Sequence, residues 1–156
     1  MSDDLYERDI LAWSERQAEL LRCVADGERV NDVDWPHVVE EIADVGISEL
    51  NAVRSHLRQT MIHLLKCHLW PDDPAQPHWR LELGTFQDNT ATRIAPFMRQ
   101  PIELQAIYDK ARARIERTVP DHPRLRAVPS ACPWSLDQLL DGDPDILLAA
   151  LPPLAR

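Results

Sequence analysis

Four side chains that can do chemistry recur along one predicted helix of more than thirty residues. Glu49, His56 and His63 are seven residues apart, so they return to nearly the same helix face, and Cys67 follows His63 by four residues. A histidine with a carboxylate to orient it can act as a general base, and imidazole with thiolate is a ligand pair that suits zinc. Residues seven apart lie about 10.5 Å from each other along a helix, so a shared metal ion would need ligands from a second helix.

His63 is the candidate general base, with Glu49 or Asp9 as the group that orients it. Gln17 interrupts the apolar stripe of the first predicted helix, where a buried amide needs hydrogen-bond partners. The candidate residues of a small acid–base enzyme are therefore Asp9, Gln17, Glu49, His56 and His63, and the weak candidates for metal ligands are His63 and Cys67.

The sequence lacks the paired Glu-x-x-His motifs with which helical bundles usually bind metals. We therefore expect no resident metal or cofactor. We interpret the histidines and their neighbours mainly as hydrogen-bonded residues at the edge of a core, and we regard catalysis as the less favoured alternative.

The elements that must position these residues are helices. Apolar residues three and four apart predict four main helices, over residues 4–25, 35–70, 77–98 and 101–118, followed by short helices near the C-terminus. Most of the thirteen prolines lie between these segments or near their ends, and only four glycines are present, which favours helices with stiff connections over hairpins. The sequence predicts an all-α bundle in a single domain of residues 1–156, with its core in about 4–141 and an apolar tail in 142–156.

The long second helix carries one apolar face along most of its length. At 100° per residue this face contains Val39, Ile42, Leu50, Val53, Leu57, Met61 and Leu64. Gly46 lies at the centre of the same face, where it permits close approach of another helix at a cost of about 1 kcal/mol relative to Ala. Asp34 is a plausible N-cap, and Pro36 is acceptable in the first turn.

The formal charge of −9 opposes binding to phosphate backbones, so we expect no nucleic-acid partner. Residues 1–36 carry ten acids and four bases, whereas 99–126 carry four acids and seven bases. We interpret this asymmetry first as complementary faces of packed helices. A basic partner for the first segment, or an acidic one for the second, is the alternative. Lys110, Arg112, Arg114 and Arg117 spread around more than half of their predicted helix, with Asp109 and Glu116 as pairing partners.

Cys23, Cys67 and Cys132 are an odd number without CxxC spacing, which predicts reduced thiols in a cytoplasmic protein. No apolar run is long enough to span a bilayer, so we expect no membrane partner. The apolar run of residues 146–151 must dock on its own bundle or on another copy. Since helical proteins of this size often form symmetric dimers, we expect a homodimer.

Three segments together resemble a known family. They are Tyr6-Glu7-Arg8-Asp9 with Trp13 and Gln17-Ala18; Glu40-Glu41-Ile42 with Gly46, Ser48-Glu49 and His63-Leu64-Leu65-Lys66; and Cys132-Pro133-Trp134-Ser135-Leu136. Over about residues 4 to 141 they resemble the bacterial domain-of-unknown-function family 29. The resemblance implies a small, soluble, all-helical protein with no assigned activity, and it transfers no catalytic residues.

Taken together, these patterns predict an acidic helical module that self-associates and acts in interaction or regulation, with an unknown protein partner as a further option. The alternative is a small metal-binding or acid–base enzyme with its site at the edge of the long second helix.

Overall fold

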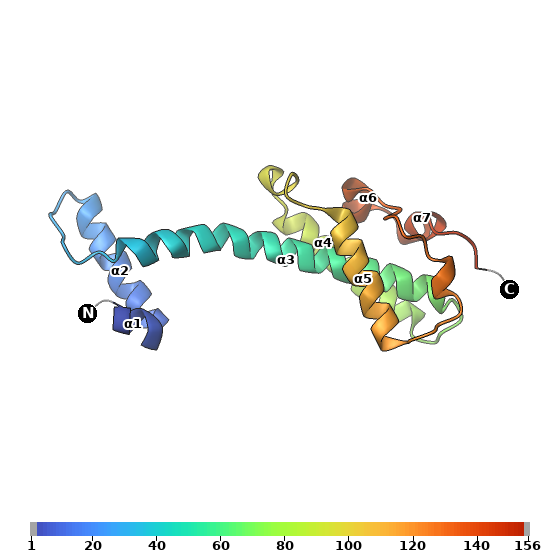
Figure 1. Cartoon of the computed structure of the whole chain (residues 1–156). Coiled ribbons are helices and arrows are strands. Elements are labelled where there is room, and N and C mark those ends of the chain that lie inside the picture. Colours follow the sequence, from blue (N-terminus) through green and yellow to red (C-terminus); the bar gives the residue numbers. More distant parts are fainter. Residues whose placement is uncertain (1–2, 155–156) are drawn as a thin grey trace. The chain divides into compact units, whose positions relative to one another are not determined.

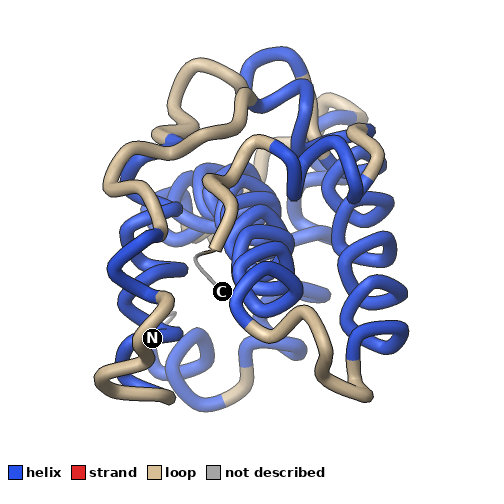
Figure 2. The backbone as a smooth tube through the Cα atoms, turned by 90° about the vertical axis from the view of Figure 1, so that its right-hand side faces the viewer, coloured by secondary structure: helices blue, strands red, loops and turns tan. Residues whose placement is uncertain are grey.

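The computed structural model describes the backbone of residues 3–154 and the side chains of residues 5–154, and its regular elements are helices (Figures 1 and 2). The α-helices are α1 (Asp3–Arg8), α2 (Ile10–Ala25), α3 (Trp35–Leu69), α4 (Gln76–Arg93), α5 (Leu104–Thr118), α6 (Leu136–Asp141) and α7 (Pro144–Ala149). Pro96–Met98 and Leu125–Ala127 form 3₁₀ turns. No described residue lies in a strand, so the predicted all-α class is confirmed. None of the described helices has the length and apolar character needed to cross a membrane.

Two predicted helix boundaries are wrong. The segment predicted as one helix over 4–25 is divided into α1 and α2, because the Asp9 carboxylate accepts a hydrogen bond from the backbone N–H of Ala12 and caps a new helix. The helix predicted over 77–98 ends at Arg93. Pro96 follows shortly, and because proline disfavours helical backbone in the preceding residue, the chain continues as a 3₁₀ turn.

Other helix ends follow local sequence signals. Gly27 adopts a φ of +87°, a conformation that ends α2 and that a side chain would disfavour. Ser135 and Gln138 form a capping box at the start of α6. These signals fix where the elements begin and end before any tertiary packing is considered.

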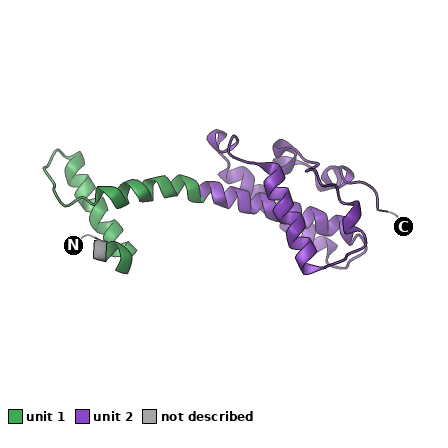
Figure 3. Ribbon diagram, viewed as in Figure 1, with its two compact units in different colours: residues 1–48 green, residues 49–156 purple. Residues whose placement is uncertain are grey.

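The chain divides into two compact units, residues 1–48 and residues 49–156, and α3 contributes residues to both (Figure 3). Buried apolar side chains form one cluster in each unit. The small cluster of unit 1 contains Trp13, Val33 and Val38. The larger cluster of unit 2 contains side chains from α3 to α7. The sequence suggested one shared core, but the buried apolar side chains form two separate clusters.

The apolar face of α3 differs between its two halves. Val53, Leu57, Met61 and Leu64 are completely buried in unit 2, as predicted. Val39 and Ile42, assigned to the same buried face, are 62% and 68% exposed, so that part of the prediction is wrong. Helical spacing identifies an apolar face, but it does not say whether the chain itself covers that face.

The C-terminal tail docks on its own unit. Leu147 and Leu151 are buried in the cluster of unit 2, and the indole N–H of Trp134 donates a hydrogen bond of 2.8 Å to the carbonyl of Leu147. Trp134 thus occupies a core position, as its place after a Cys-Pro turn predicts. The sequence left open whether the tail docks on its own bundle or on another copy. Leu147 and Leu151 dock on unit 2, whereas Ile146 is 67% exposed.

Candidate functional site

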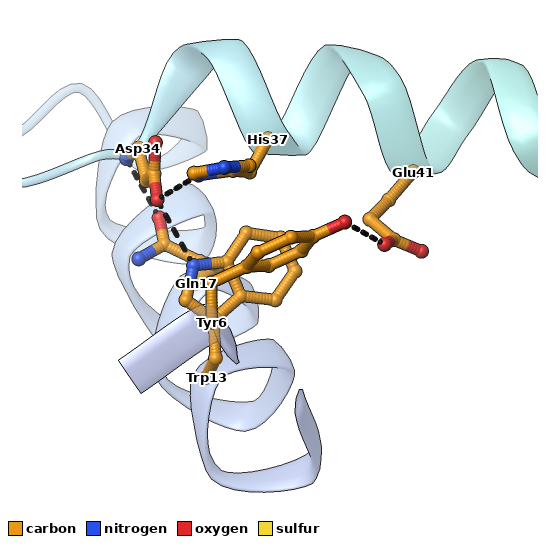
Figure 4. A network of polar contacts seen from close by, with 6 residues as sticks. All are labelled: Tyr6, Trp13, Gln17, Asp34, His37 and Glu41. Atoms are coloured by element: carbon orange, nitrogen blue, oxygen red, sulfur yellow. Dashed lines mark hydrogen bonds and ion pairs between the residues drawn. The ribbon is translucent and has the colours of Figure 1, made fainter. Parts of the chain in front are cut away.

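A buried carboxylate organises the polar contacts of unit 1 (Figure 4). Asp34 immediately precedes α3 and is 7% exposed. Its carboxylate accepts hydrogen bonds from the indole N–H of Trp13 at 3.1 Å and from Nδ1 of His37 at 2.7 Å. Its backbone N–H donates to Oε1 of Gln17 at 2.9 Å. A buried amide carbonyl without a hydrogen bond would destabilise the fold. The Gln17 carbonyl avoids this cost because it accepts a hydrogen bond from the backbone at the start of α3.

Tyr6 completes this arrangement from α1. Its ring stacks on His37 with centroids 3.9 Å apart, and it meets the edge of Trp13 at 4.9 Å. Its hydroxyl donates a 2.7 Å hydrogen bond to Glu41, and this bond to a carboxylate raises the pKa of Tyr6 to about 12. We call the six residues drawn in Figure 4 the Asp34 network: Tyr6, Trp13, Gln17, Asp34, His37 and Glu41.

The Asp34 network has a structural role: its hydrogen bonds hold α2 against the beginning of α3. The His37 hydrogen bond, supported by the Trp13 N–H, holds the pKa of the Asp34 carboxyl below its ordinary value in spite of burial. An ionised, hydrogen-bonded Asp34 ties α2 to the beginning of α3. Tyr6, Trp13, Gln17 and Glu41 belong to the segments on which the family resemblance rests, so those motifs in unit 1 build the fold.

His63, the candidate general base, lies in unit 2 with both ring nitrogens engaged. Nδ1 lies 2.8 Å from the carbonyl oxygen of Gln59, and Nε2 lies 2.8 Å from a carboxylate oxygen of Glu82. Since a carbonyl and an ionised carboxylate only accept hydrogen bonds, both bonds exist together in the imidazolium form. The bond from His63 lowers the pKa of the Glu82 carboxyl.

The group that orients His63 is thus Glu82 of α4, which the sequence analysis did not identify. Glu49 instead forms an ion pair of 3.0 Å with Arg93, on the solvent-exposed side of α3. The signal for Glu82 was weak: it lies four residues after His78, a spacing that places the pair on one helix face, and those two side chains lie 3.5 Å apart.

The remaining candidates are dispersed. His56 and His63 both lie beside the ring of Phe86, at centroid distances of 6.1 and 5.3 Å. Cys67 is buried, and burial raises its pKa and so disfavours the thiolate form. Asp9 serves as the cap of α2 in unit 1. Within the described residues, no three His, Cys, Asp or Glu side chains are grouped so that they could hold a metal ion.

The first part of α3 presents an uncovered apolar surface. Five large side chains there are between 52% and 68% exposed, and we call them the α3 apolar sector: Trp35, Val39, Ile42, Val45 and Ile47. At 100° per residue these side chains, with Gly46, occupy more than half of the helix circumference. The charged residues of the same turns, Glu40, Glu41 and Asp44, fall on the other side.

Gly46 lies within the α3 apolar sector. No described atom outside its own helix turn lies within 4 Å of the position that a Cβ would take there. The described chain therefore gives no packing reason for a glycine that weakens the helix by about 1 kcal/mol relative to Ala. Together with the exposed side chains, it makes this surface the strongest candidate for a functional site.

Comparison with known proteins agrees with this description. The chain is similar to an α-helical protein of unknown function from Rhodospirillum rubrum, known from a crystal structure, with 28% identity and a TM-score of 0.71. The similarity covers 95% of this chain and 98% of that one. No curated protein matches. The family model described as "Domain of unknown function DUF29" matches residues 5–143, and the chain therefore belongs to this family.

Proposed function

We propose that this protein is a self-associating interaction module in which two copies pair through the α3 apolar sector. The observation that carries the proposal is a set of five large apolar side chains, each at least half exposed, in the first part of one helix. Contiguous exposed apolar surface of this kind is unfavourable in water and commonly marks a protein interface. An exposed tryptophan, Trp35, adds the side-chain type most enriched at interface hot spots.

A second copy is the occupant that the charges favour. The chain carries a net charge of −9, so two copies repel each other through most of their surfaces. The α3 apolar sector contains no charged residue, and the neighbouring acids Glu40, Glu41 and Asp44 lie on the other side of the helix. Two sectors related by a two-fold axis can therefore meet without opposing carboxylates. Gly46 would let the two helices approach closely.

The test is the mass of the full chain in solution, measured by sedimentation across a concentration series. The wild-type chain should reach twice its 17.9 kDa mass. Ile42→Glu should remain monomeric, because two buried isoleucines, worth about 1.5–3 kcal/mol each, would be replaced by two facing carboxylates. The matched control is Leu81→Glu, which makes the same change at a side chain that is 71% exposed on α4.

Dimerisation of Leu81→Glu at wild-type concentrations would support the proposal. A wild-type chain that stays monomeric up to millimolar concentration would refute it. So would an equal loss of dimer in both variants, because general charge repulsion would then explain the result. Far-ultraviolet circular dichroism should show unchanged helix content in both, since neither side chain is buried.

The proposal includes a reduced, cytoplasmic setting and a regulatory role, and it disfavours the acid–base alternative. A reduced, cytoplasmic setting is supported by three free cysteines, Cys23, Cys67 and Cys132. The acid–base alternative has less support, because Glu49 pairs with Arg93 and the bonds of His63 to Gln59 and Glu82 occupy both of its ring nitrogens. A regulatory role would follow from control of the self-association.

A further inference from the structure

Two hollows adjoin on the surface of unit 2 between α3 and α5. One has a volume of about 640 Å³ and the other of about 510 Å³. Gln59, Ile62 and Arg114 line both hollows, so the two lie side by side, and we call them together the α3–α5 groove. Each volume falls in the range of about 300–1,000 Å³ that is typical of small-molecule sites.

One end of the α3–α5 groove is strongly cationic. It is lined by Arg58, Lys110, Arg114 and Arg117. None of these four side chains makes an ion pair within the described part of the chain. Arg58 is half-buried, where an unpaired charge is less well solvated. The chain has a net charge of −9, whereas these four cations without ion pairs make the charge around this hollow positive.

Three of the four basic residues of α5 share one side of the helix, although the four together spread around more than half of it. Lys110, Arg114 and Arg117 are spaced by four and three, so they share one side. Arg112 faces elsewhere, with its guanidinium 5.9 Å from the centre of the Tyr108 ring. The expected pairing with Asp109 is also not found, since that carboxylate accepts a hydrogen bond from Gln105 instead.

The other end of the groove is aromatic. Trp70 and Trp79 line it, with their ring centroids 6.4 Å apart in an edge-to-face arrangement. The Lys66 ammonium lies 4.4 Å from the centre of the Trp79 ring. Ile115, which is buried in the last turn of α5, adds a further apolar side chain to the lining. Asp73 also lines this hollow, so the groove joins a mainly aromatic and apolar surface, with one carboxylate, to a cationic one.

We propose that the α3–α5 groove binds a small organic anion with an aromatic or otherwise apolar body. The anionic group meets the guanidinium groups of Arg58 and Arg114, which match carboxylate, phosphate or sulfonate oxygens in a bidentate fashion. The apolar body lies against Trp70 and Trp79. A polyanion such as an acidic peptide would satisfy the cations but leave the tryptophan wall unused, so the combination favours the small amphiphilic ligand.

The test is isothermal titration calorimetry of the full chain with 2-naphthalenesulfonate, which has both required parts. We expect saturable binding at one site per chain. Methanesulfonate, with the charge alone, and 2-naphthol, with the aromatic body alone, should each bind at least tenfold more weakly. Arg114→Ala should weaken 2-naphthalenesulfonate binding at least tenfold, because Arg114 lines both hollows.

The matched control is Arg126→Ala, which removes the same charge from an exposed position in unit 2 outside both hollows. It should change the affinity by less than twofold. Ile42→Glu should also bind normally, because its position is in unit 1, and this separates the groove from the proposed dimer. The proposal is overturned by the absence of saturable binding, by equal losses in the two arginine variants, or by equal affinity for methanesulfonate. Tighter binding of hexaglutamate would overturn it in favour of an acidic peptide.

Discussion

At the scale of single residues, the Asp34 network explains why unit 1 folds with a very small apolar cluster. Among the described residues, that cluster has three buried side chains, Trp13, Val33 and Val38, with partly buried apolar side chains such as Leu20 and Leu21 packed against them. The hydrogen bonds to the Asp34 carboxylate, and from its backbone to Gln17, supply a specific geometry where apolar burial is limited. A polar network of this kind stabilises the fold only while every member is satisfied.

Removing the Asp34 carboxylate should therefore destabilise unit 1 strongly. Asp34→Ala removes the carboxylate that accepts hydrogen bonds from the Trp13 indole N–H and from His37, which predicts a loss of about 2–3 kcal/mol in the free energy of unfolding. Urea denaturation followed by tryptophan fluorescence measures this loss. Asp88→Ala, at an exposed position on α4, is the control and should change stability by less than about 0.5 kcal/mol. Equal stability of both variants would show that the network is dispensable.

The same carboxylate predicts a pH dependence. The pKa of Asp34 lies below its ordinary value of 3.8, chiefly because His37 donates a hydrogen bond to the ionised form. A lowered pKa means that the stabilisation is fully present above 3.8 and is lost as the pH falls through the folded-state value. As the pH falls below 3.8 the wild type should therefore lose more stability than Asp34→Asn, whose amide does not ionise. Parallel pH profiles in urea denaturation would contradict this assignment.

At the scale of elements, α3 shows what helical periodicity can and cannot predict. The 100° pattern located the helix and its buried residues Val53 and Leu57, because burial within one chain follows the spacing of apolar side chains. The same pattern extends to Ile42, which is exposed, because periodicity cannot identify the partner of a face. Glu82 was missed as the partner of His63 for a related reason: which helices pack together is not encoded in either helix alone.

A substitution at Gly46 tests whether a second helix packs against the α3 apolar sector. Gly46→Ala should stabilise each isolated copy by about 1 kcal/mol, since Ala is the better helix former and the described chain has room for the methyl group. It should nevertheless weaken dimerisation at least tenfold if a second helix lies against that position. Sedimentation and thermal unfolding measure the two effects separately.

Gly84→Ala is the matched control, because Gly84 lies within α4 and also has room for a Cβ. It should raise the stability of the helix and leave dimerisation unchanged. If Gly46→Ala likewise leaves dimerisation unchanged, no close helix approach occurs at Gly46.

At the scale of the whole molecule, the chain combines two units with different surfaces. Unit 1 carries the uncharged α3 apolar sector, and unit 2 carries the cationic end of the α3–α5 groove. The sequence predicted the helical class and the family, and it showed the opposite net charges of residues 1–36 and 99–126. It did not predict the two clusters or the groove, because Arg58 and Arg114 are 56 positions apart and meet only when α3 packs beside α5.

The most direct test of the account is a cross-link between copies. In a chain with Cys23 and Cys132 changed to Ser, Ile42→Cys should form a covalent dimer on mild oxidation, because Ile42 lies near the middle of the α3 apolar sector. Leu81→Cys in the same background is the control and should form little covalent dimer, because Leu81 lies on α4, outside the sector. An Ile42→Cys chain that forms no more covalent dimer than Leu81→Cys would contradict pairing through this sector.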